Sequence, residues 1–312
     1  MVRVERFAGA KAAGFAGLAD KHAIEAEMDW SARDVPRTLH GLLARTADRF
    51  PDLPAVSYQL LSDPAAPAET LTWAGLYART CRAANLFRSL GIGPTDTVAC
   101  ILPNATETVL TLLGGATAGI VAPINPLLEP EQIASILRET GAKVVVTLRP
   151  FPKTDVAQKV AQAVRDAPQV ETVLEVDLNR YLRPPKSWLV PLIRPRAGVA
   201  HHAKVLDFAA ELARQNTKLD FPDPPADRVA AYFHTGGTTG MPKVAQQKYS
   251  GQVYNGWIGK RLLFTQKDTL ICPLPLFHVF AAVVVVSAAL TSGAHVVFPT
   301  PAGYRGPGVF DN

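Results

Sequence analysis

The stretch Tyr232-Phe-His-Thr-Gly-Gly-Thr-Thr-Gly-Met-Pro-Lys243 carries more information about this chain than any other. It starts inside an apolar run, Val229–His234, that predicts a buried strand, and continues into a loop of three glycines and three threonines. Glycine lets the backbone turn several N–H groups toward one point, and threonine hydroxyls add donors around it. Such a loop suits phosphate oxygens, and Lys243 adds a positive charge at its exit.

The loop differs from other phosphate-binding motifs. In the pattern Gly-x-x-x-x-Gly-Lys-Ser/Thr the lysine follows the last glycine directly, whereas Met241 and Pro242 separate Gly240 from Lys243 here. The dinucleotide pattern Gly-x-Gly-x-x-Gly does not fit either. An unliganded Gly/Thr hairpin is the alternative, but a strand before the run and Pro-Lys after it favour phosphate binding. A loop that leaves a buried strand lies at the carboxyl edge of the sheet, where ligands of open α/β sheets collect.

Apolar strand-like runs alternate with amphipathic helical stretches along most of the chain. Strands joined by helices of this length need crossover connections, which give a mainly parallel sheet covered by helices on both faces. The predicted fold class is therefore α/β. We predict strands at Val98–Leu102, Val121–Ile124, Lys143–Thr147, Thr172–Val176, Thr269–Cys272 and Ala294–Phe298, and helices at Leu39–Phe50, Trp73–Leu90, Thr106–Ala118, Glu131–Thr140, Asp155–Ala167, Gln252–Leu263 and Val279–Ser292.

Composition narrows the class of protein. The 312 residues are 48% hydrophobic and carry a net charge of +5, which is ordinary for a mildly basic globular chain. Three widely spaced cysteines predict reduced thiols in a cytoplasmic protein, and the N-terminus lacks the apolar core of a signal peptide. We expect no nucleic-acid partner, since no RNA-binding aromatic motif occurs. We assign no metal ligands, because the adjacent pair His201-His202 lacks the spacing of paired ligands on a helix.

A basic, proline-rich segment interrupts the alternation at about residues 180–225. Between Arg180 and Lys204 there are six basic residues and no acidic one, beside the apolar group around Trp188. This region is interpreted as an insertion or linker. Clustered positive charge next to a tryptophan and aliphatic residues predicts peripheral contact with an anionic membrane surface, and an ordinary solvated loop is the alternative.

Several motifs in order resemble one family. Thr235–Lys243 resembles the signature loop of the AMP-forming acyl-CoA synthetase, luciferase and peptide-synthetase adenylation superfamily, and the resemblance extends from about residue 39 to residue 312. Gly236 stands where many members have serine and Val244 where many have glycine, as in variants among long fatty-acyl ligases. The other matching motifs are Leu71-Thr-Trp73, Pro103-Asn104, Pro123-Ile-Asn125-Pro126 and Pro273-Leu-Pro-Leu-Phe-His278.

The resemblance implies a two-step reaction. A carboxylate attacks the α-phosphate of ATP and releases pyrophosphate, and coenzyme A then displaces AMP to give a thioester. His278 is expected at the wall of the carboxylate pocket, or else as a cap on the turn before a buried helix. ATP, Mg²⁺ and coenzyme A are the implied cofactors, and a carboxylic acid, with a fatty acid favoured, is the implied substrate. The residues expected to bind ATP phosphates are Thr235, Gly236, Gly237, Thr238, Thr239, Gly240 and Lys243.

The resemblance also divides the chain. Residues 1–38 are expected to form an N-terminal head and residues 39–312 an incomplete AMP-binding domain without the family's C-terminal domain. The family's adenylation lysine and its magnesium-binding glutamate have no counterpart here, so the catalytic residues stay unknown. We therefore expect an acid–thiol ligase that is inactive as this chain alone, or completed by a separately encoded half. A non-catalytic nucleotide-binding module or remnant, and an aryl-acid or peptide-synthetase adenylation domain, are the alternatives.

Overall fold

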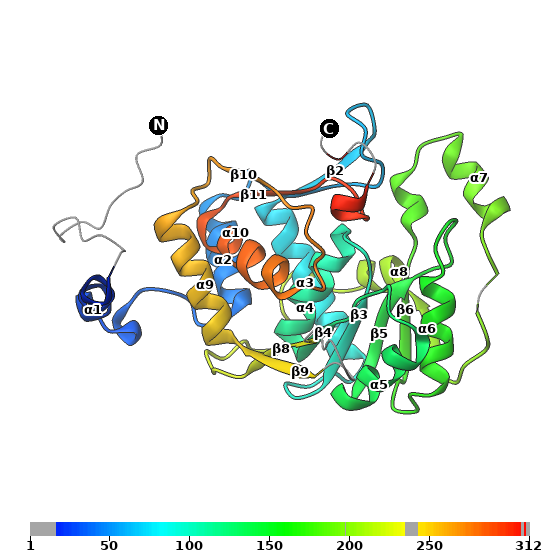
Figure 1. Ribbon diagram of the computed structural model, residues 1–312, viewed down its shortest axis with the longest axis horizontal. Helices are drawn as coiled ribbons and strands as arrows, with labels where there is room; N and C mark the ends of the chain where they lie inside the picture. The colour runs from blue at the N-terminus through cyan, green and yellow to red at the C-terminus, as the bar shows by residue number, and fades with distance from the viewer. Residues whose placement is uncertain (1–16, 197, 235–242, 307–308, 310–312) are drawn as a thin grey trace.

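The computed structural model describes residues 17–196, 198–234, 243–306 and 309. Within these residues the chain forms a seven-stranded and a four-stranded sheet with helices between and around them (Figure 1). The predicted α/β class, with mainly parallel strands covered by helices, is confirmed.

The seven-stranded sheet has the order β7-β6-β5-β3-β4-β8-β9, and all neighbouring pairs are parallel except β8 and β9. Its central strands are buried on both faces, and all five residues of β3 are buried, which explains why the sequence shows continuous apolar runs there. The strands are β3 (Thr97–Ile101), β4 (Ile120–Pro123), β5 (Ala142–Leu148), β6 (Thr172–Val176), β7 (Lys204–Asp207), β8 (Val229–His234) and β9 (Val244–Lys248).

Helices cover both faces of this sheet. The helices α3 (Trp73–Ser89) and α4 (Thr106–Ala118) pack on each other. Helix α3 contacts β1 and β2, and α4 contacts strands of both sheets, so this pair lies between the two. The helices α5 (Pro130–Thr140) and α6 (Val156–Arg165) pack together on the opposite face. Right-handed crossovers from β4 to β5 and from β5 to β6 place them there. Helix α5 ends at Thr140 as predicted, and Gly141 follows with a φ of 62°, a left-handed conformation that glycine adopts without strain.

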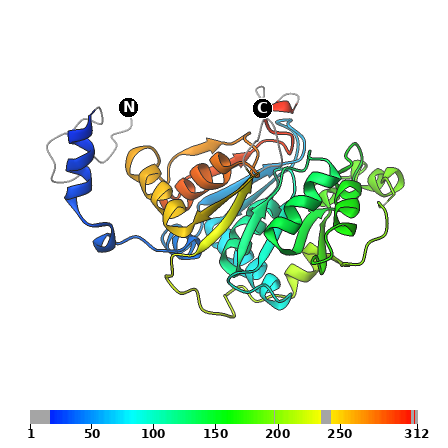
Figure 2. The same ribbon diagram turned by 60° about the horizontal axis from the view of Figure 1, so that its bottom comes forward.

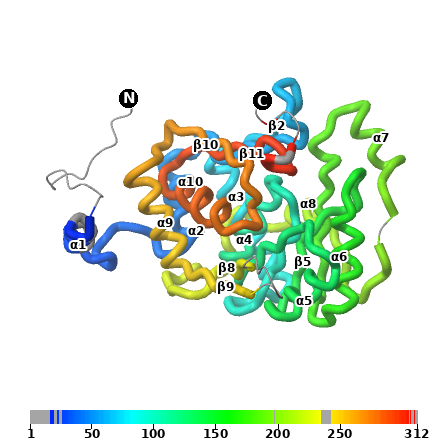
Figure 3. The backbone as a smooth tube through the Cα atoms, in the orientation of Figure 1, coloured from blue at the N-terminus to red at the C-terminus, as the bar shows by residue number. Residues whose placement is uncertain are grey.

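The four-stranded sheet joins distant parts of the chain. It has the order β10-β11-β1-β2, and its strands are β1 (Pro54–Gln59), β2 (Ala68–Thr72), β10 (Thr269–Ile271) and β11 (His295–Phe298). Strand β1 runs parallel to β11, with Val56 opposite Val296. Figure 3 shows the early and late segments of the chain meeting in this sheet. The sequence pattern predicts β10 and β11 but gave no prediction for β1 and β2.

The helices α2 (Leu39–Arg49), α9 (Tyr249–Leu262) and α10 (Val286–Ser292) pack together beside the sheets. A π-helical segment, Phe280–Val285, precedes α10, so the predicted helix at Val279–Ser292 consists of two parts. Glycines on α9 allow a close crossing with α10, because a Cβ atom added at Gly259 would lie 2.6 Å from the Cβ of Ala288.

The segment at about 180–225 contains regular structure. A 3-10 turn (Leu178–Tyr181) leads into α7 (Lys186–Ile193), β7 extends the seven-stranded sheet, and α8 (Phe208–Ala213) packs against α3. Figure 2, turned by 60° from Figure 1, shows α7 and the N-terminal helix α1 (Leu18–Glu27) at opposite ends of the molecule. Across the described ranges, no helix is both long and apolar enough to cross a membrane.

Candidate functional site

The two ends of the predicted phosphate loop lie at the carboxyl edge of the seven-stranded sheet. The loop residues Thr235–Gly240, together with Met241 and Pro242, fall outside the described residues. His234 is the last residue of β8, and Lys243 comes directly before β9; His234 pairs with Val244 across the two antiparallel strands. Because β8 runs parallel to β4, the loop leaves the sheet at the same edge as the ends of β3 and β4.

The residues that flank the loop differ in charge. Burial lowers the pKa of His234 below its ordinary value, so this imidazole is neutral at pH 7. Lys243 is exposed to solvent. Of the two flanking residues, Lys243 is the basic one that lies next to the loop on the side of β9.

Asn104 joins two of the motifs at this edge. It follows β3, is only 2% exposed, and its Nδ2 donates to the carbonyl oxygen of Leu274 at 2.8 Å. Its Oδ1 accepts from the backbone N–H of Leu276, also at 2.8 Å. The stretch Pro273–His278 is therefore held against the end of β3, although 170 residues separate the two in sequence.

The Pro123–Pro126 motif leaves β4 beside it. Ile124 donates its backbone N–H to the carbonyl of Cys100, which continues the ladder one residue beyond the strand. The side-chain oxygen of Asn125 accepts from the N–H of Leu127 at 2.9 Å and fixes the turn that follows. Three of the resembling motifs thus converge on the edge from which the loop departs.

His278 lies at the start of the π-helical segment and is exposed. Its Nδ1 accepts a hydrogen bond from the backbone N–H of Phe280 at 3.3 Å, and its carbonyl accepts from Ala282 at 3.1 Å. The ring therefore caps the first turn of the helical segment, as the second of the two sequence interpretations describes. A place in the wall of a carboxylate pocket stays a prediction.

Comparison with known families agrees with this arrangement of motifs. The model of the family described as "AMP-binding enzyme" matches residues 43–310. The chain belongs to the AMP-binding enzyme family.

Relatives and solved structures extend the comparison. The chain is 32% identical over 231 residues to the marinolic acid–CoA ligase of Pseudoalteromonas sp. (strain SANK 73390), covering 72% of this chain and 32% of the relative. It is 27% identical over 272 residues to the long-chain-fatty-acid–CoA ligase of Bacillus subtilis (strain 168), covering 84% and 46%. The crystal structure of the anthranilate CoA ligase AuaEII in complex with anthranoyl-AMP superposes with a TM-score of 0.68 at 18% identity, covering 87% and 47%. The chain thus spans about a third to a half of the length of these proteins.

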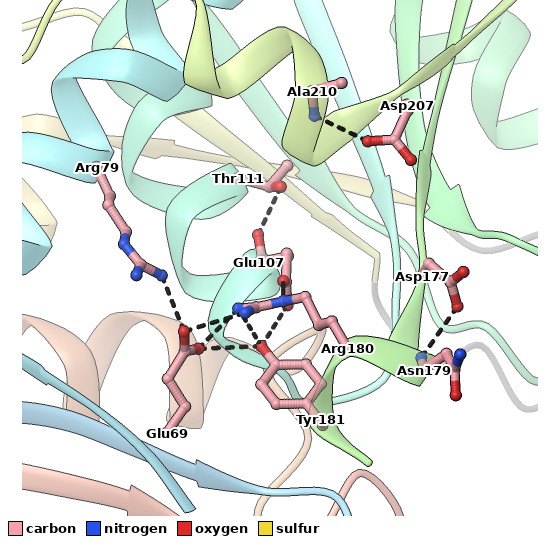
Figure 4. Close-up of polar contacts among 10 residues, drawn as sticks. All are labelled: Glu69, Arg79, Glu107, Thr111, Asp177, Asn179, Arg180, Tyr181, Asp207 and Ala210. Atoms are coloured by element: carbon pink, nitrogen blue, oxygen red, sulfur yellow. Dashed lines mark hydrogen bonds and ion pairs between the residues drawn. The ribbon is translucent and has the colours of Figure 1, made fainter. Parts of the chain in front are cut away.

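A partly buried ion-pair network in this AMP-binding family member was not predicted from the sequence (Figure 4). Glu107, 4% exposed at the start of α4, accepts from Arg180 Nε at 2.6 Å and from the hydroxyl of Tyr181 at 2.7 Å. Arg180 also donates to Glu69 on β2 at 2.8 Å, and Arg79 on α3 donates to the same carboxylate at 2.9 Å. The network ties both sheets to the helix layer between them.

Charges in this network neutralise one another. Burial by itself lowers the pKa of Arg180, but the carboxylates of Glu107 and Glu69 outweigh it and raise the pKa above the ordinary value. The positive charge of Arg180 is therefore balanced by carboxylates, unlike that of the exposed basic residues with which the sequence groups it. The one sequence signal for this network is that Glu107 is the single charged residue of the helix at Thr106–Ala118.

A second polar cluster joins α2, α3 and the segment before β8. His40 Nδ1 lies 3.2 Å from the carboxylate of Asp223, and its Nε2 lies 3.7 Å from Cys81 Sγ. Burial by itself lowers the pKa of His40, but the hydrogen bonds to Asp223 and Cys81 outweigh it and raise the pKa to about 9. The order Cys–His–Asp is that of a thiol nucleophile, yet Cys81 is 0% exposed and no substrate reaches it. We assign this cluster a structural role.

No group of three or more His, Cys, Asp or Glu side chains in the described part of the chain is arranged to hold a metal ion.

Proposed function

We propose that this chain forms the ATP- and acid-binding part of an ATP-dependent acyl-CoA synthetase. The observation that carries the proposal is the convergence of the loop ends, Asn104 and the Pro123–Pro126 motif on one carboxyl edge of the sheet. Membership of the family and the CoA ligases among its relatives support it. In this proposal residues 39–312 belong to the AMP-binding domain and residues 1–38 form a separate head.

The proposed reaction has two steps. A carboxylate oxygen of the acid attacks the α-phosphorus of ATP, the bond to the bridging oxygen breaks, and pyrophosphate leaves with both electrons of that bond. The thiolate of coenzyme A then attacks the acyl carbon and AMP leaves, which gives the thioester. Both steps depend mainly on positioning and on neutralisation of phosphate charge.

The predicted loop supplies what the first step needs. Backbone N–H groups and hydroxyls of Thr235–Gly240 would hold the β- and γ-phosphates, and Lys243 would neutralise the charge of the leaving pyrophosphate. Mg²⁺ bound together with ATP would supply further positive charge at the phosphates.

A fatty acid is the proposed substrate. The long-chain-fatty-acid–CoA ligase among the relatives and the residues Gly236 and Val244 in the loop support it. An aryl acid is the alternative, and the fold shared with the anthranilate CoA ligase favours neither.

Turnover is proposed for an enzyme larger than this chain. The matched relatives are about twice as long, so we propose that a further polypeptide segment supplies the groups for adenine, ribose and the mobile domain. A non-catalytic nucleotide-binding remnant is the alternative. Supplying ATP, Mg²⁺, coenzyme A and a panel of fatty and aryl acids, with and without the polypeptide encoded downstream, separates the two. Pyrophosphate release only with the added polypeptide favours the ligase, whereas none in either case favours the remnant.

The direct test of the site is ATP binding by Lys243→Ala. Removal of one charge-assisted contact weakens binding by about 1.5–3 kcal/mol, or about 10- to 150-fold. Lys248→Ala at the other end of β9 removes the same charge from an exposed position and is the matched control. Isothermal titration that gives equal affinities for the two variants means that Lys243 does not contact the phosphates.

A further inference from the structure

Helix α7 presents an apolar face to solvent. Trp188 and Leu192, one turn apart, are 70% and 81% exposed, and Leu189 and Ile193 form a second stripe that is 51% and 63% exposed. Val190 alone among the large apolar residues of the helix is buried. Figures 1 and 2 both show α7 at the margin of the molecule. Four large apolar side chains exposed on one short helix form a patch that suits an interaction partner.

The charge around this patch is positive. No acidic residue occurs between Asp177 and Asp207 in the sequence. Two basic residues of the segment are held by carboxylates, since Arg180 pairs with Glu107 and Arg194 pairs with Asp177 at 2.8 Å. The remaining basic residues of the segment are exposed. Arg183 and Lys186 border the start of α7, whereas Arg196 and Lys204 lie farther along the chain, with Lys204 at the start of β7. A patch with this rim is complementary to an anionic surface.

A cavity of about 610 Å³ lies behind the helix. Its walls are mainly apolar and come from α7, from the end of β5 and from the segments after β1, β3, β4, β5, β6 and β11, so the cavity borders the Pro103-Asn104 and Pro123–Pro126 motifs. The lining residues include Leu148, Phe151, Leu178, Leu182, Val190 and Ile193. The volume is within the range of small-molecule sites, and the apolar walls suit a hydrocarbon chain.

Two lysines also line the cavity. Lys153 and Lys186 are exposed, and neither forms an ion pair with any residue that the structure describes. Leu189 and Ile193 line the cavity as well as facing solvent, so the cavity opens beside the apolar stripe of the helix. The arrangement fits an amphiphile with an anionic head and an apolar chain.

We propose that α7 docks on a bilayer containing anionic lipids and that the cavity behind it receives a hydrocarbon chain from that surface. Trp188 and Leu192 enter the boundary between headgroups and acyl chains, where tryptophan is favoured. The basic residues around the helix bind lipid headgroups. Vesicle binding requires neither ATP nor coenzyme A, so the proposal stands or fails independently of the proposed ligase activity.

Co-sedimentation of the 312-residue chain with phosphatidylcholine vesicles, with and without phosphatidylserine, tests the docking. Arg183→Gln combined with Lys186→Gln lowers partitioning about 25-fold, since each basic residue near an anionic surface contributes about five-fold. Lys218→Gln combined with Lys267→Gln removes two exposed positive charges elsewhere and leaves partitioning unchanged. Equal binding to both vesicle types, or equal effects of the two double variants, overturns the proposal.

The exposed apolar face of α7 has its own test. Leu192→Ser weakens vesicle binding, whereas Leu263→Ser, at a residue 63% exposed near the end of α9, does not. The tryptophan emission of the chain shifts to the blue on anionic vesicles, and Trp188→Phe abolishes the shift although three other tryptophans remain. A dimer in lipid-free sedimentation that Leu192→Ser dissociates assigns the face to a second copy of the chain and refutes membrane docking.

The cavity is tested with a fluorescent fatty acid as the probe. Leu182→Trp fills the cavity, so it lowers binding of the probe while binding to anionic vesicles persists. Unchanged probe binding in this variant shows that the hydrocarbon chain of the probe binds elsewhere and overturns that part of the proposal.

Discussion

The crossing of α9 and α10 gives a sharp prediction about packing. A Cβ atom added at Gly256 would lie 2.5 Å from the carbonyl oxygen of Ser287 and would also overlap the hydroxyl of Thr291. The backbone carbonyl cannot rotate away, so Gly256→Ala forces the two helices apart. Gly251, in the first turn of the same helix, has only Gln247 Oε1 near such a Cβ, at 3.7 Å, and Gly251→Ala is the matched control.

The expected magnitude follows from comparing the two variants. Glycine to alanine inside a helix stabilises by up to about 1 kcal/mol, and this gain is common to both positions. Overpacking costs about 1–3 kcal/mol and applies only at Gly256. The free energy of unfolding of Gly256→Ala is therefore expected to be about 1–3 kcal/mol lower than that of Gly251→Ala.

Urea denaturation followed by far-UV circular dichroism measures this difference. The midpoint is expected to fall for Gly256→Ala and to stay level or rise for Gly251→Ala, with the same slope against urea in both. A difference below about 0.5 kcal/mol refutes the reasoning, because the crossing is then looser than the backbone distances require.

Two further predictions concern polar groups. Asn104→Ala is expected to lower the free energy of unfolding by about 2–4 kcal/mol, because it leaves two backbone groups without their hydrogen-bond partner near the sheet edge. The same urea titration should show a smaller loss for Asn255→Ala, because the one side-chain bond of Asn255 lies within its own helix. The raised pKa of His40 adds stability that is fully present below pH 6.5 and is lost as pH rises through about 9. Thermal melts between pH 6.5 and 9 are expected to show that the free energy of unfolding falls by an amount on the order of 1–3 kcal/mol. Asp223→Asn should make this dependence on pH weaker. Identical pH dependence in the two proteins would contradict the role of the pair.

The alternation of strands and helices is predictable from the sequence because each of these elements carries its own pattern of apolar residues that become buried. The predicted bounds Thr106–Ala118 and Thr172–Val176 are those observed for α4 and β6. Strand β1 was not predicted because one of its two partners, β11, lies far away in the sequence, and local pattern carries no information about that partner. Strand β2 is an edge strand with one buried residue, so it shows no strand-like apolar run.

The candidate site was also predicted only in part. The ends of the phosphate loop lie at the predicted sheet edge, since a strand pattern fixes where its carboxyl end points. The link from Asn104 to Leu274 and the network around Glu107 were not predictable, because both join side chains or backbone groups across long stretches of chain. A run of basic residues in the sequence does not reveal which of them has a carboxylate partner, and Arg180 has such a partner in Glu107.

The pairing of β1 with β11 has a consequence for the nascent chain. Roughly 220 residues separate the end of β2 from the start of β11. At about 5–20 residues per second, the ribosome therefore needs about 10–45 s after β2 to synthesise the chain up to β11. During that interval the edge of β1 that later binds β11 has free backbone groups beside apolar side chains, a surface prone to pairing with other chains. Synthesis of this protein is therefore expected to depend on a chaperone that covers the early hairpin until residues 295–298 have emerged.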